Sequence, residues 1–214
     1  TQREGVNQYG DPVDILESGY VRFYELLGFI PKTISNFTKN VEMIFNKKRD
    51  LLIVVGGGSL PPSMYDRPHE DELQPNRDRM EEQVIHYCVA HGIPIIATCR
   101  GMQYMNVMFG GKLWYHPKLP VTRTRGMDHQ VWLVKEQRNI WVNNYHSDCI
   151  YEEGLAPCFE PLAIDRENHV VEAYGSDEMK ILALQWHPER RFETANAYEE
   201  TRKIVLDFIQ KHVK

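Results

Sequence analysis

The stretch Ile93-Pro94-Ile95-Ile96-Ala97-Thr98-Cys99-Arg100-Gly101 decides the fold, because it joins a buried strand to a helix through a sharp turn. A short apolar run bounded by turn residues is typical of a strand that is covered on both faces. We expect this strand to span 93–97 and the helix after it to span 100–109. A side chain at such a turn is held out above the sheet, and the helix start favours negative charge there. Cys99 is therefore the candidate nucleophile.

Segments of alternating type flank this turn. Helical spacing of apolar residues predicts further helices over 14–27, 38–47, 76–91 and 195–213. Apolar runs predict a short strand at 29–34 and a buried strand at 51–55, which ends in Gly56-Gly57-Gly58. This alternation predicts an α/β fold with a doubly wound, mostly parallel sheet flanked by helices. Ligands bind at the carboxyl ends of such strands, where the glycine turn and Cys99 both lie.

The pattern changes between 126 and 184. Short apolar segments there predict strands at 131–134, 140–142, 162–164, 170–174 and 181–184, with a turn at Glu167-Asn168. We expect them to form a small additional antiparallel sheet. The segment 59–75 is rich in proline and charge, which favours a long loop over the crevice. We expect residues 1–214 to form one domain, since this length suits a single core.

Composition excludes several functions. The net charge of -5 argues against a general nucleic-acid binder, and the longest apolar runs are too short to cross a bilayer. The four cysteines form no CxxC pair, so we expect neither a zinc site nor a disulfide framework. We expect no metal and no organic cofactor. Cysteine usage and the lack of a signal-peptide pattern favour a cytoplasmic location.

A candidate base for Cys99 follows the last predicted strand, in Gln185-Trp186-His187-Pro188-Glu189. Alternate side chains of an extended chain point the same way, and Pro188 favours an extended conformation at His187. Glu189 can then hold one imidazole nitrogen while the other serves Cys99. The sequence therefore predicts a catalytic Cys99–His187–Glu189 set.

Attack by a thiolate on an acyl carbon creates an oxyanion, which needs fixed donors. The backbone N–H of Arg100, just after the nucleophile, is one candidate. The N–H of Gly57 or Gly58 is the other, because glycine lets the backbone approach a substrate closely.

At these residues the chain resembles a class I glutamine amidotransferase domain of flavodoxin-like fold, and in particular its γ-glutamyl hydrolase (peptidase C26) branch. Three segments carry the resemblance: 99–113, which begins Cys99-Arg100-Gly101-Met102-Gln103, Val142-Asn143-Asn144-Tyr145-His146-Ser147, and 185–189. Asn144 stands where that branch has a serine.

The resemblance implies a γ-glutamyl thioester on Cys99 that water then hydrolyses. It also implies that Gln103 and the segment Asn144-Tyr145-His146 hold the glutamyl head of the substrate. His146 is equally well read as a packing residue. In this branch the opening Thr1-Gln2-Arg3 follows a first strand, so we expect either a segment before Thr1 or a sheet without that strand.

The resemblance does not identify the group that is attached to the amide nitrogen of the substrate. The three candidates are γ-glutamyl-CDP-amidate, which would give cytidine diphosphoramidate for capsule polysaccharide synthesis, γ-glutamyl-γ-aminobutyrate, and free glutamine. We favour the nucleotide conjugate here, because arginine forks suit a diphosphate and several arginines lie near the expected crevice. These are Arg67, Arg77, Arg79, Arg123, Arg125, Arg190 and Arg191.

Other classes of function remain as alternatives. The chain could be a glutaminase subunit that delivers ammonia to a separate synthase, or a non-catalytic subunit that binds and regulates a partner. An esterase of the dienelactone-hydrolase type shares the cysteine turn but needs neither Gln103 nor the His-Pro-Glu segment. We expect a small-molecule substrate and leave a homodimer and a transient synthase partner open.

Overall fold

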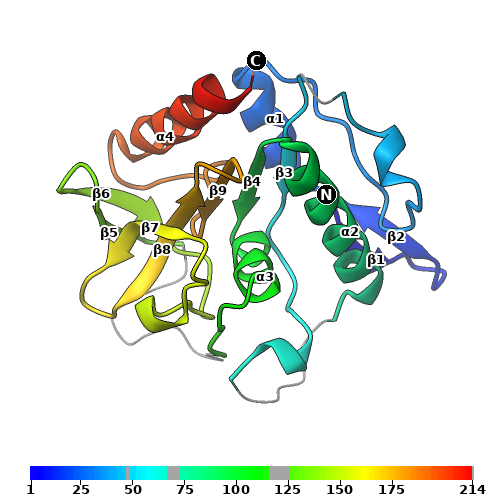
Figure 1. Cartoon of the computed structure of the whole chain (residues 1–214), viewed down its shortest axis with the longest axis horizontal. Coiled ribbons are helices and arrows are strands. Elements are labelled where there is room, and N and C mark those ends of the chain that lie inside the picture. Colours follow the sequence, from blue (N-terminus) through cyan, green and yellow to red (C-terminus); the bar gives the residue numbers. More distant parts are fainter. Residues whose placement is uncertain (47–48, 67–72, 116–125, 214) are drawn as a thin grey trace.

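A computed structural model describes residues 1–46, 49–66, 73–115 and 126–213 (Figure 1). Four α-helices and nine strands are described, together with three short 3-10 turns. The helices are α1 (Ser18–Leu26), α2 (Pro75–His91), α3 (Arg100–Met108) and α4 (Ala197–His212). The strands are β1 (Arg3–Val6), β2 (Pro12–Ile15), β3 (Leu52–Val54), β4 (Ile95–Thr98), β5 (Asp128–Leu133), β6 (Arg138–Asn143), β7 (Glu160–Asp165), β8 (Val170–Ser176) and β9 (Ile181–Leu184).

Helices cover both faces of a large sheet, and strand residues alternate between the two cores. Ile95 and Ala97 of β4 pack with α2 and α3, whereas Ile96 between them packs with α1 and α4. The period of two follows from the pleat of a strand. In Figure 1, α1 and α4 lie along the top of the view, and α2 and α3 lie lower. This is the expected α/β architecture.

The large sheet is mixed, which corrects the expectation of a mostly parallel one. Its seven strands lie in the order β3-β4-β9-β8-β7-β5-β6. Only the β3–β4 and β4–β9 pairs are parallel, and the other described pairs are antiparallel. Short turns join β5 to β6, β7 to β8 and β8 to β9, and such turns permit only antiparallel pairing. The strands of 128–184 therefore extend the large sheet, and the small antiparallel sheet is the β1–β2 pair.

Two predicted elements near the N-terminus are wrong. Residues 29–34 form no strand: Pro31 interrupts the segment and removes a backbone donor. The predicted helix over 38–47 is only a 3-10 turn at Val41–Met43 in its described part, and Lys47 lies outside the described residues. Three apolar residues in ten matched a helical pattern. In so short a segment, the few helical hydrogen bonds do not offset the unfavourable free energy of helix nucleation. The turn suffices to bury Val41.

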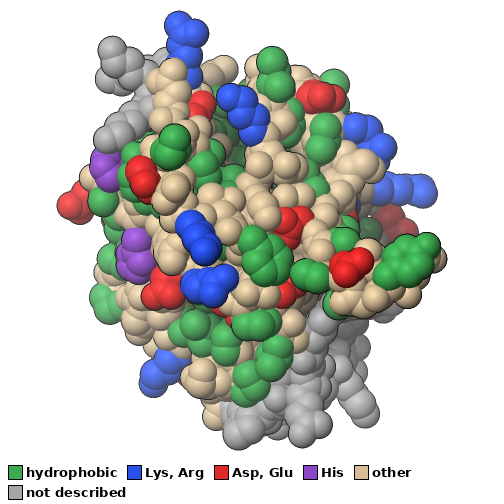
Figure 2. Space-filling model, turned by 90° about the vertical axis from the view of Figure 1, so that its right-hand side faces the viewer, with side chains coloured by type: hydrophobic (Ala, Val, Ile, Leu, Met, Phe, Trp, Pro, Cys, Tyr) green, Lys and Arg blue, Asp and Glu red, His purple; other side chains and the backbone are tan. Residues whose placement is uncertain are grey.

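The surface shows no concentration of one charge on the face drawn in Figure 2, where positive, negative and hydrophobic side chains are interspersed. No described helix combines the length and apolar character needed to cross a membrane.

Candidate active site

Cys99 occupies the turn between β4 and α3 in a conformation that non-glycine residues rarely adopt, with φ 52° and ψ -110°. Such backbone costs on the order of 1–3 kcal/mol and persists only where the surroundings enforce it. Here the Cys99 N–H donates to the Leu184 carbonyl at 2.7 Å, and the Cys99 carbonyl accepts from Gln103 at 3.0 Å. The sheet and the helix thus hold the turn from both ends. Cys99 as a whole residue is 8% exposed.

Gly101 lets α3 start directly against the sheet. A Cβ built on Gly101 would lie 2.5 Å from the backbone oxygen of Val54 in β3, which is well inside contact distance. Any larger residue would push the start of α3 away from the sheet. The sequence Cys99-Arg100-Gly101 therefore fixes where the nucleophile stands relative to β3.

His187 follows β9, the strand next to β4, and is held by its backbone. The Asn143 side chain accepts from the His187 N–H at 2.9 Å and donates to the His187 carbonyl at 2.8 Å. The imidazole Nδ1 lies 2.6 Å from Oε1 of Glu189. Both side chains are almost fully buried. The predicted arrangement, in which a carboxylate two residues away orients the ring, is what the structure shows.

Cys99 and His187 meet beside Gly56. A Cβ built on Gly56 would lie 2.7 Å from Cε1 of His187 and 3.2 Å from Cβ of Cys99, so the two side chains share one small space. Glycine at position 56 is therefore what makes room for the pair.

The electrostatics of the pair favour a thiolate and an imidazolium. Burial raises the pKa of Cys99, but the neighbouring His187 outweighs it, so the thiol pKa lies below its usual value of 9.0. Burial likewise lowers the pKa of His187, yet Cys99 and Glu189 together raise it to about 9. The thiolate is the nucleophilic form of cysteine.

The three candidate oxyanion donors belong to the turn after β3 and to the start of α3. Gly57 and Gly58 form the turn after β3 with φ 83° and 77°, which glycine adopts without strain. No acceptor among the described residues takes their N–H groups. Arg100 is the first residue of α3, where backbone N–H groups have no partner within the helix. Its side chain is buried and turns to Asp78 and Glu81.

Two of the residues expected to hold substrate are engaged within the protein. The side-chain nitrogen of Gln103 donates to the Asp148 carbonyl and to Oε1 of Gln185, both at 3.2 Å. His146 has Nδ1 at 3.1 Å from the Asp148 carbonyl and Nε2 at 3.5 Å from Oε2 of Glu172. Gln103 therefore has only its oxygen left for a ligand, and His146 is a buried ring with both nitrogens occupied.

His146 acts on Cys99 through its charge. Burial lowers the pKa of His146, but the fully buried Glu172 carboxylate overrides this and raises it to about 10. The resulting imidazolium is one of the charges that lower the pKa of Cys99. The charge of His146 thus reaches the nucleophile without direct contact with it.

Asn144 and Tyr145 differ in their surroundings. Asn144 is buried, and neither polar atom of its side chain has a partner among the described residues. The Tyr145 ring meets the His187 ring edge-on at 5.6 Å between centroids. The Arg190 guanidinium lies over the Tyr145 ring, 4.6 Å from its centroid. Tyr145 therefore packs against His187 and helps to hold its ring in position.

Sequence reasoning missed the buried charges beneath the site, which are Arg77, Asp78, Glu81 and Glu172. An Arg and a Glu four residues apart on a helix usually form a surface pair, so Arg77 and Glu81 gave no sign of burial. Glu172 did carry a signal. It is a lone charge in the apolar strand Val170-Val171-Glu172-Ala173-Tyr174, and buried charges need partners.

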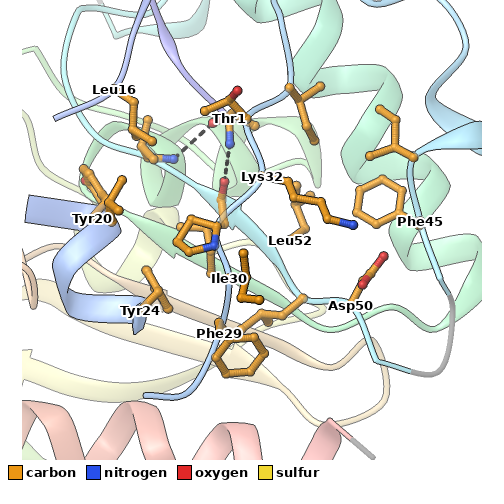
Figure 3. A pocket seen from close by; sticks show the side chains of 18 of the residues that line it. Thr1, Leu16, Tyr20, Tyr24, Phe29, Ile30, Lys32, Phe45, Asp50 and Leu52 are labelled. Atoms are coloured by element: carbon orange, nitrogen blue, oxygen red, sulfur yellow. Dashed lines mark hydrogen bonds between the residues drawn. The ribbon is translucent and has the colours of Figure 1, made fainter. Parts of the chain in front are cut away.

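A separate cavity lies on the α1 side of β3 and does not involve these residues (Figure 3). Tyr20 and Tyr24 of α1, Phe29 and Leu52 line it, and Thr1 donates its amino group to the Ile53 carbonyl at 2.6 Å beside it. None of the predicted site residues lines this cavity. The candidate active site is instead at the carboxyl ends of β3, β4 and β9.

A cysteine on a strained strand-to-helix turn, beside a His and a Glu that follow a neighbouring strand, is the arrangement typical of hydrolases that use a cysteine nucleophile. The comparisons with known proteins give the family. The model of the Peptidase C26 family matches residues 2–189, and the chain belongs to this family. It is a hydrolase acting on carbon–nitrogen bonds.

Curated relatives are similar over most of their length. The chain is 28% identical to Protein NtpR of Enterococcus hirae, over 84% of this chain and 83% of the relative. It is 29% identical to the glutamine amidotransferase-like protein YvdE of Lactococcus lactis, over 68% of each. It is 26% identical to the γ-glutamyl-γ-aminobutyrate hydrolase PuuD of Escherichia coli, over 70% of this chain and 67% of that enzyme.

A solved structure supports the fold. A protein of Thermoplasma acidophilum, provisionally described as one of the subunits of GMP synthase, superposes with a TM-score of 0.62 at 20% identity. The match covers 90% of this chain and 86% of that one. The α/β fold, with its mixed sheet between helices, is therefore shared with that protein.

Proposed function

We propose that this chain hydrolyses the γ-glutamyl amide bond of a small molecule through a γ-glutamyl thioester on Cys99. One observation carries the proposal: Cys99, His187 and Glu189 lie buried together, with Oε1 of Glu189 2.6 Å from Nδ1 of the imidazole and the Cys99 side chain next to the same ring beside Gly56. Membership of the Peptidase C26 family supports the bond type.

In the first half of the proposed reaction, the Cys99 thiolate attacks the γ-carbonyl carbon. The carbonyl oxygen takes the negative charge, within reach of the backbone N–H groups of Gly57, Gly58 and Arg100. The carbon–nitrogen bond then breaks. The His187 imidazolium gives its proton to the leaving nitrogen, so a neutral amine departs and a thioester remains.

In the second half, neutral His187 takes a proton from water, and the hydroxide attacks the thioester carbon. The carbon–sulfur bond breaks, glutamate leaves, and the Cys99 thiolate and the His187 imidazolium are restored. Glu189 stabilises the charged ring in both halves and keeps Nδ1 facing away from the substrate.

A small amine is the leaving group that the comparisons favour, since relatives that match about 70% of this chain are named γ-glutamyl-γ-aminobutyrate hydrolases. We therefore place γ-glutamyl-γ-aminobutyrate first among the substrates. The nucleotide conjugate γ-glutamyl-CDP-amidate, and with it a role in capsule synthesis, stays a prediction.

The arginines that favoured a diphosphate leaving group support it less than the sequence suggested. Arg77 is fully buried and bonds backbone carbonyls and Glu81, so it is not available to a ligand. Arg190 is paired with Glu17 at 3.0 Å. Arg67, Arg123 and Arg125 lie outside the described residues. Arg79 and Arg191 are the members of the set that the structure describes as exposed.

Parallel assays of glutamate release test the proposal and rank the substrates. γ-Glutamyl-γ-aminobutyrate, γ-glutamyl-CDP-amidate and glutamine are each supplied to the wild type and to Cys99→Ala. We expect release from at least one conjugate by the wild type, fastest from γ-glutamyl-γ-aminobutyrate, and none above background by Cys99→Ala. Release that survives in Cys99→Ala contradicts the proposal.

The alternatives give different results in the same experiment. A dominant rate on glutamine indicates a glutaminase subunit that serves a synthase. Ester hydrolysis without glutamate release indicates an esterase. Failure of a glutamine-like diazo-ketone to label Cys99 in the native protein, together with no release, indicates a non-catalytic binding subunit.

A further inference from the structure

Arg77 of α2 bonds the glycine turn from beneath. Its guanidinium donates to the Gly57 carbonyl at 2.7 Å, to the Gly56 carbonyl at 3.4 Å and to the Val55 carbonyl. Three successive carbonyls therefore point at one buried side chain. Every described peptide bond is trans, so the N–H of each peptide unit points opposite to its carbonyl.

The first of these units shows this geometry directly. The Val55 carbonyl faces Arg77 on the α2 side, and the N–H in the same peptide, that of Gly56, donates at 2.9 Å to the Tyr20 hydroxyl of α1. Tyr20 belongs to the core on the opposite face of the sheet from α2. In the next two units, the carbonyls of Gly56 and Gly57 face Arg77, so the N–H groups of Gly57 and Gly58 point away from it.

We propose that Arg77 is a positioning residue for the oxyanion site: by binding the carbonyls of Gly56 and Gly57 it aims the N–H groups of Gly57 and Gly58 at the substrate oxygen. This inference rests on the proposed function for the identity of that oxygen. A guanidinium suits the task, because it presents several donors in one rigid plane. The positive charge of the guanidinium also polarises each peptide group whose carbonyl it binds. This strengthens the N–H of that peptide group as a donor.

The same charges tie the turn to the nucleophile. Glu81 accepts from Arg77 at 2.8 Å through Oε1 and from Arg100 at 2.7 Å through Oε2. Arg100 is the residue after Cys99, and it also bonds Asp78 and the Ser59 carbonyl. One carboxylate of α2 therefore spans the glycine turn and the start of α3. We call Arg77, Asp78, Glu81 and Arg100 the buried quartet.

The quartet is electrically balanced, with two cations and two carboxylates, as buried charges require. Burial raises the pKa of Glu81, but Arg77 and Arg100 outweigh it and hold that pKa below its usual value. Glu81 is then charged at neutral pH. Its link between the two arginines keeps the distance between the oxyanion donors and Cys99 fixed.

Two reagents distinguish the two roles that Arg77 could have, which are to position the oxyanion donors or only to support the shape of the site. 4-Nitrophenyl acetate acylates a thiolate through a tetrahedral oxyanion and needs no γ-glutamyl group. Iodoacetamide alkylates the same thiolate by displacement at a carbon atom that forms no oxyanion. Both reactions are followed by mass spectrometry on the Cys99 peptide, because the exposed Cys158 also reacts.

For Arg77→Met we expect acylation of Cys99 to slow by about 10- to 100-fold. This is less than the slowing that follows removal of a complete oxyanion donor, because the donors remain and only their direction is disturbed. Alkylation should stay within about 2-fold, since the thiolate and His187 are untouched. Arg77→Lys keeps the charge but not the planar fork, and should fall between wild type and Arg77→Met. The control is Arg202→Met, which removes an exposed arginine of α4 paired with Glu199 and should change neither rate.

Equal slowing of both reactions overturns the inference, because it shows that Arg77 only supports the shape of the site. No change in either rate overturns it too. If Arg77→Met does not fold, the ratio of the two rates in Arg77→Lys decides. If wild-type protein releases no glutamate but the two reactions still separate, the proposed function fails and the role of Arg77 stands.

Discussion

Cys99 experiences two opposing influences, burial and the neighbouring imidazolium. Burial favours the neutral thiol, whereas His187 favours the thiolate and prevails. The charge on His187 is in turn supported by Glu189 and by the thiolate itself. Each charge in the pair therefore depends on the other. Removing His187 should raise the pKa of Cys99 as well as remove the group that transfers protons.

The first prediction concerns the pH dependence of Cys99 alkylation. In the wild type, the thiol pKa lies below its usual value of 9.0, so alkylation should stay fast as pH falls through 9.0 and decline only below it. In His187→Asn the largest cause that lowers this pKa is gone and burial remains. The midpoint should then move to higher pH. The measurement is the rate of iodoacetamide labelling of the Cys99 peptide against pH.

Cys158 provides the internal control for that titration. It is exposed and forms no disulfide, and His187 is not among the groups that affect its pKa, so its labelling profile should be the same in wild type and variant. A Cys99 midpoint that is unchanged in His187→Asn would show that the thiolate does not depend on the imidazolium.

A second prediction ranks the three side chains of the proposed catalytic set. Cys99→Ala should abolish turnover, since no other nucleophile stands in the turn. His187→Asn should lose about 100- to 10,000-fold, the usual effect of a general acid–base group. Glu189→Gln should lose less than His187→Asn, because an amide still orients the ring. Initial rates of glutamate release give the order, and a larger loss in Glu189→Gln than in Cys99→Ala would make these roles wrong.

At the scale of elements, Glu172 joins β8 to the segment that carries His146. Its carboxylate lies 3.5 Å from His146 and 3.5 Å from His129. Because the carboxylate is fully buried in an otherwise apolar strand, the strand needs these imidazoles nearby. The contact therefore couples the middle of the sheet to the residues after β6.

A third prediction follows from the sign of the His146 shift. Its pKa in the folded protein, about 10, lies above the usual 6.5, so its stabilising contribution is complete below about pH 6.5 and is lost as pH rises through 10. In Glu172→Gln the main cause of the raised pKa is absent. Between pH 7 and 10, the free energy of unfolding should therefore fall more steeply in wild type than in Glu172→Gln.

Urea unfolding at several pH values measures this difference. His187 also has a raised pKa, but it contributes equally to both proteins and cancels in the comparison. Parallel pH profiles for wild type and Glu172→Gln would show that Glu172 does not set the charge of His146.

A fourth prediction tests how closely α3 approaches β3. Gly101→Ala places a methyl group 2.5 Å from the Val54 oxygen, so α3 must shift. We expect a loss of about 1–3 kcal/mol in the free energy of unfolding, the usual cost of overpacking, together with reduced activity. Gly110→Ala is the matched control at the other end of α3. It meets no atom within 4 Å and should lose about 1–2 kcal/mol through its positive φ alone, with activity retained.

At the scale of the whole molecule, the central part of the fold could be predicted and its periphery could not. The strand before Cys99 and the helices on either side of it have strong apolar patterns, and they lie within two residues of their expected bounds. The antiparallel pairing of the strands from β5 to β8 was predicted, but their place in the large sheet was not. Which strand lies next to which across a sheet is a tertiary property that no local pattern contains.

The site divides in the same way. Cys99, His187 and Glu189 come together because two strands next to each other end at the same edge of the sheet, which the sequence indicates through its turns. The surroundings of Gln103 and His146 were not foreseeable. Gln103 bonds Asp148 and Gln185, which lie 45 and 82 residues away in the chain, and His146 meets Glu172 of another strand. Burial of Arg77 depends on α2 packing over the glycine turn, which no local pattern encodes.

The most direct test of the central claim is the chemical state of Cys99 during turnover. Protein turning over γ-glutamyl-γ-aminobutyrate, or whichever γ-glutamyl compound it hydrolyses fastest, is quenched in acid, digested and analysed by mass spectrometry. We predict that the Cys99 peptide carries one additional γ-glutamyl group, which hydroxylamine removes. A γ-glutamyl group on any other residue, or turnover that persists in Cys99→Ala, would contradict it.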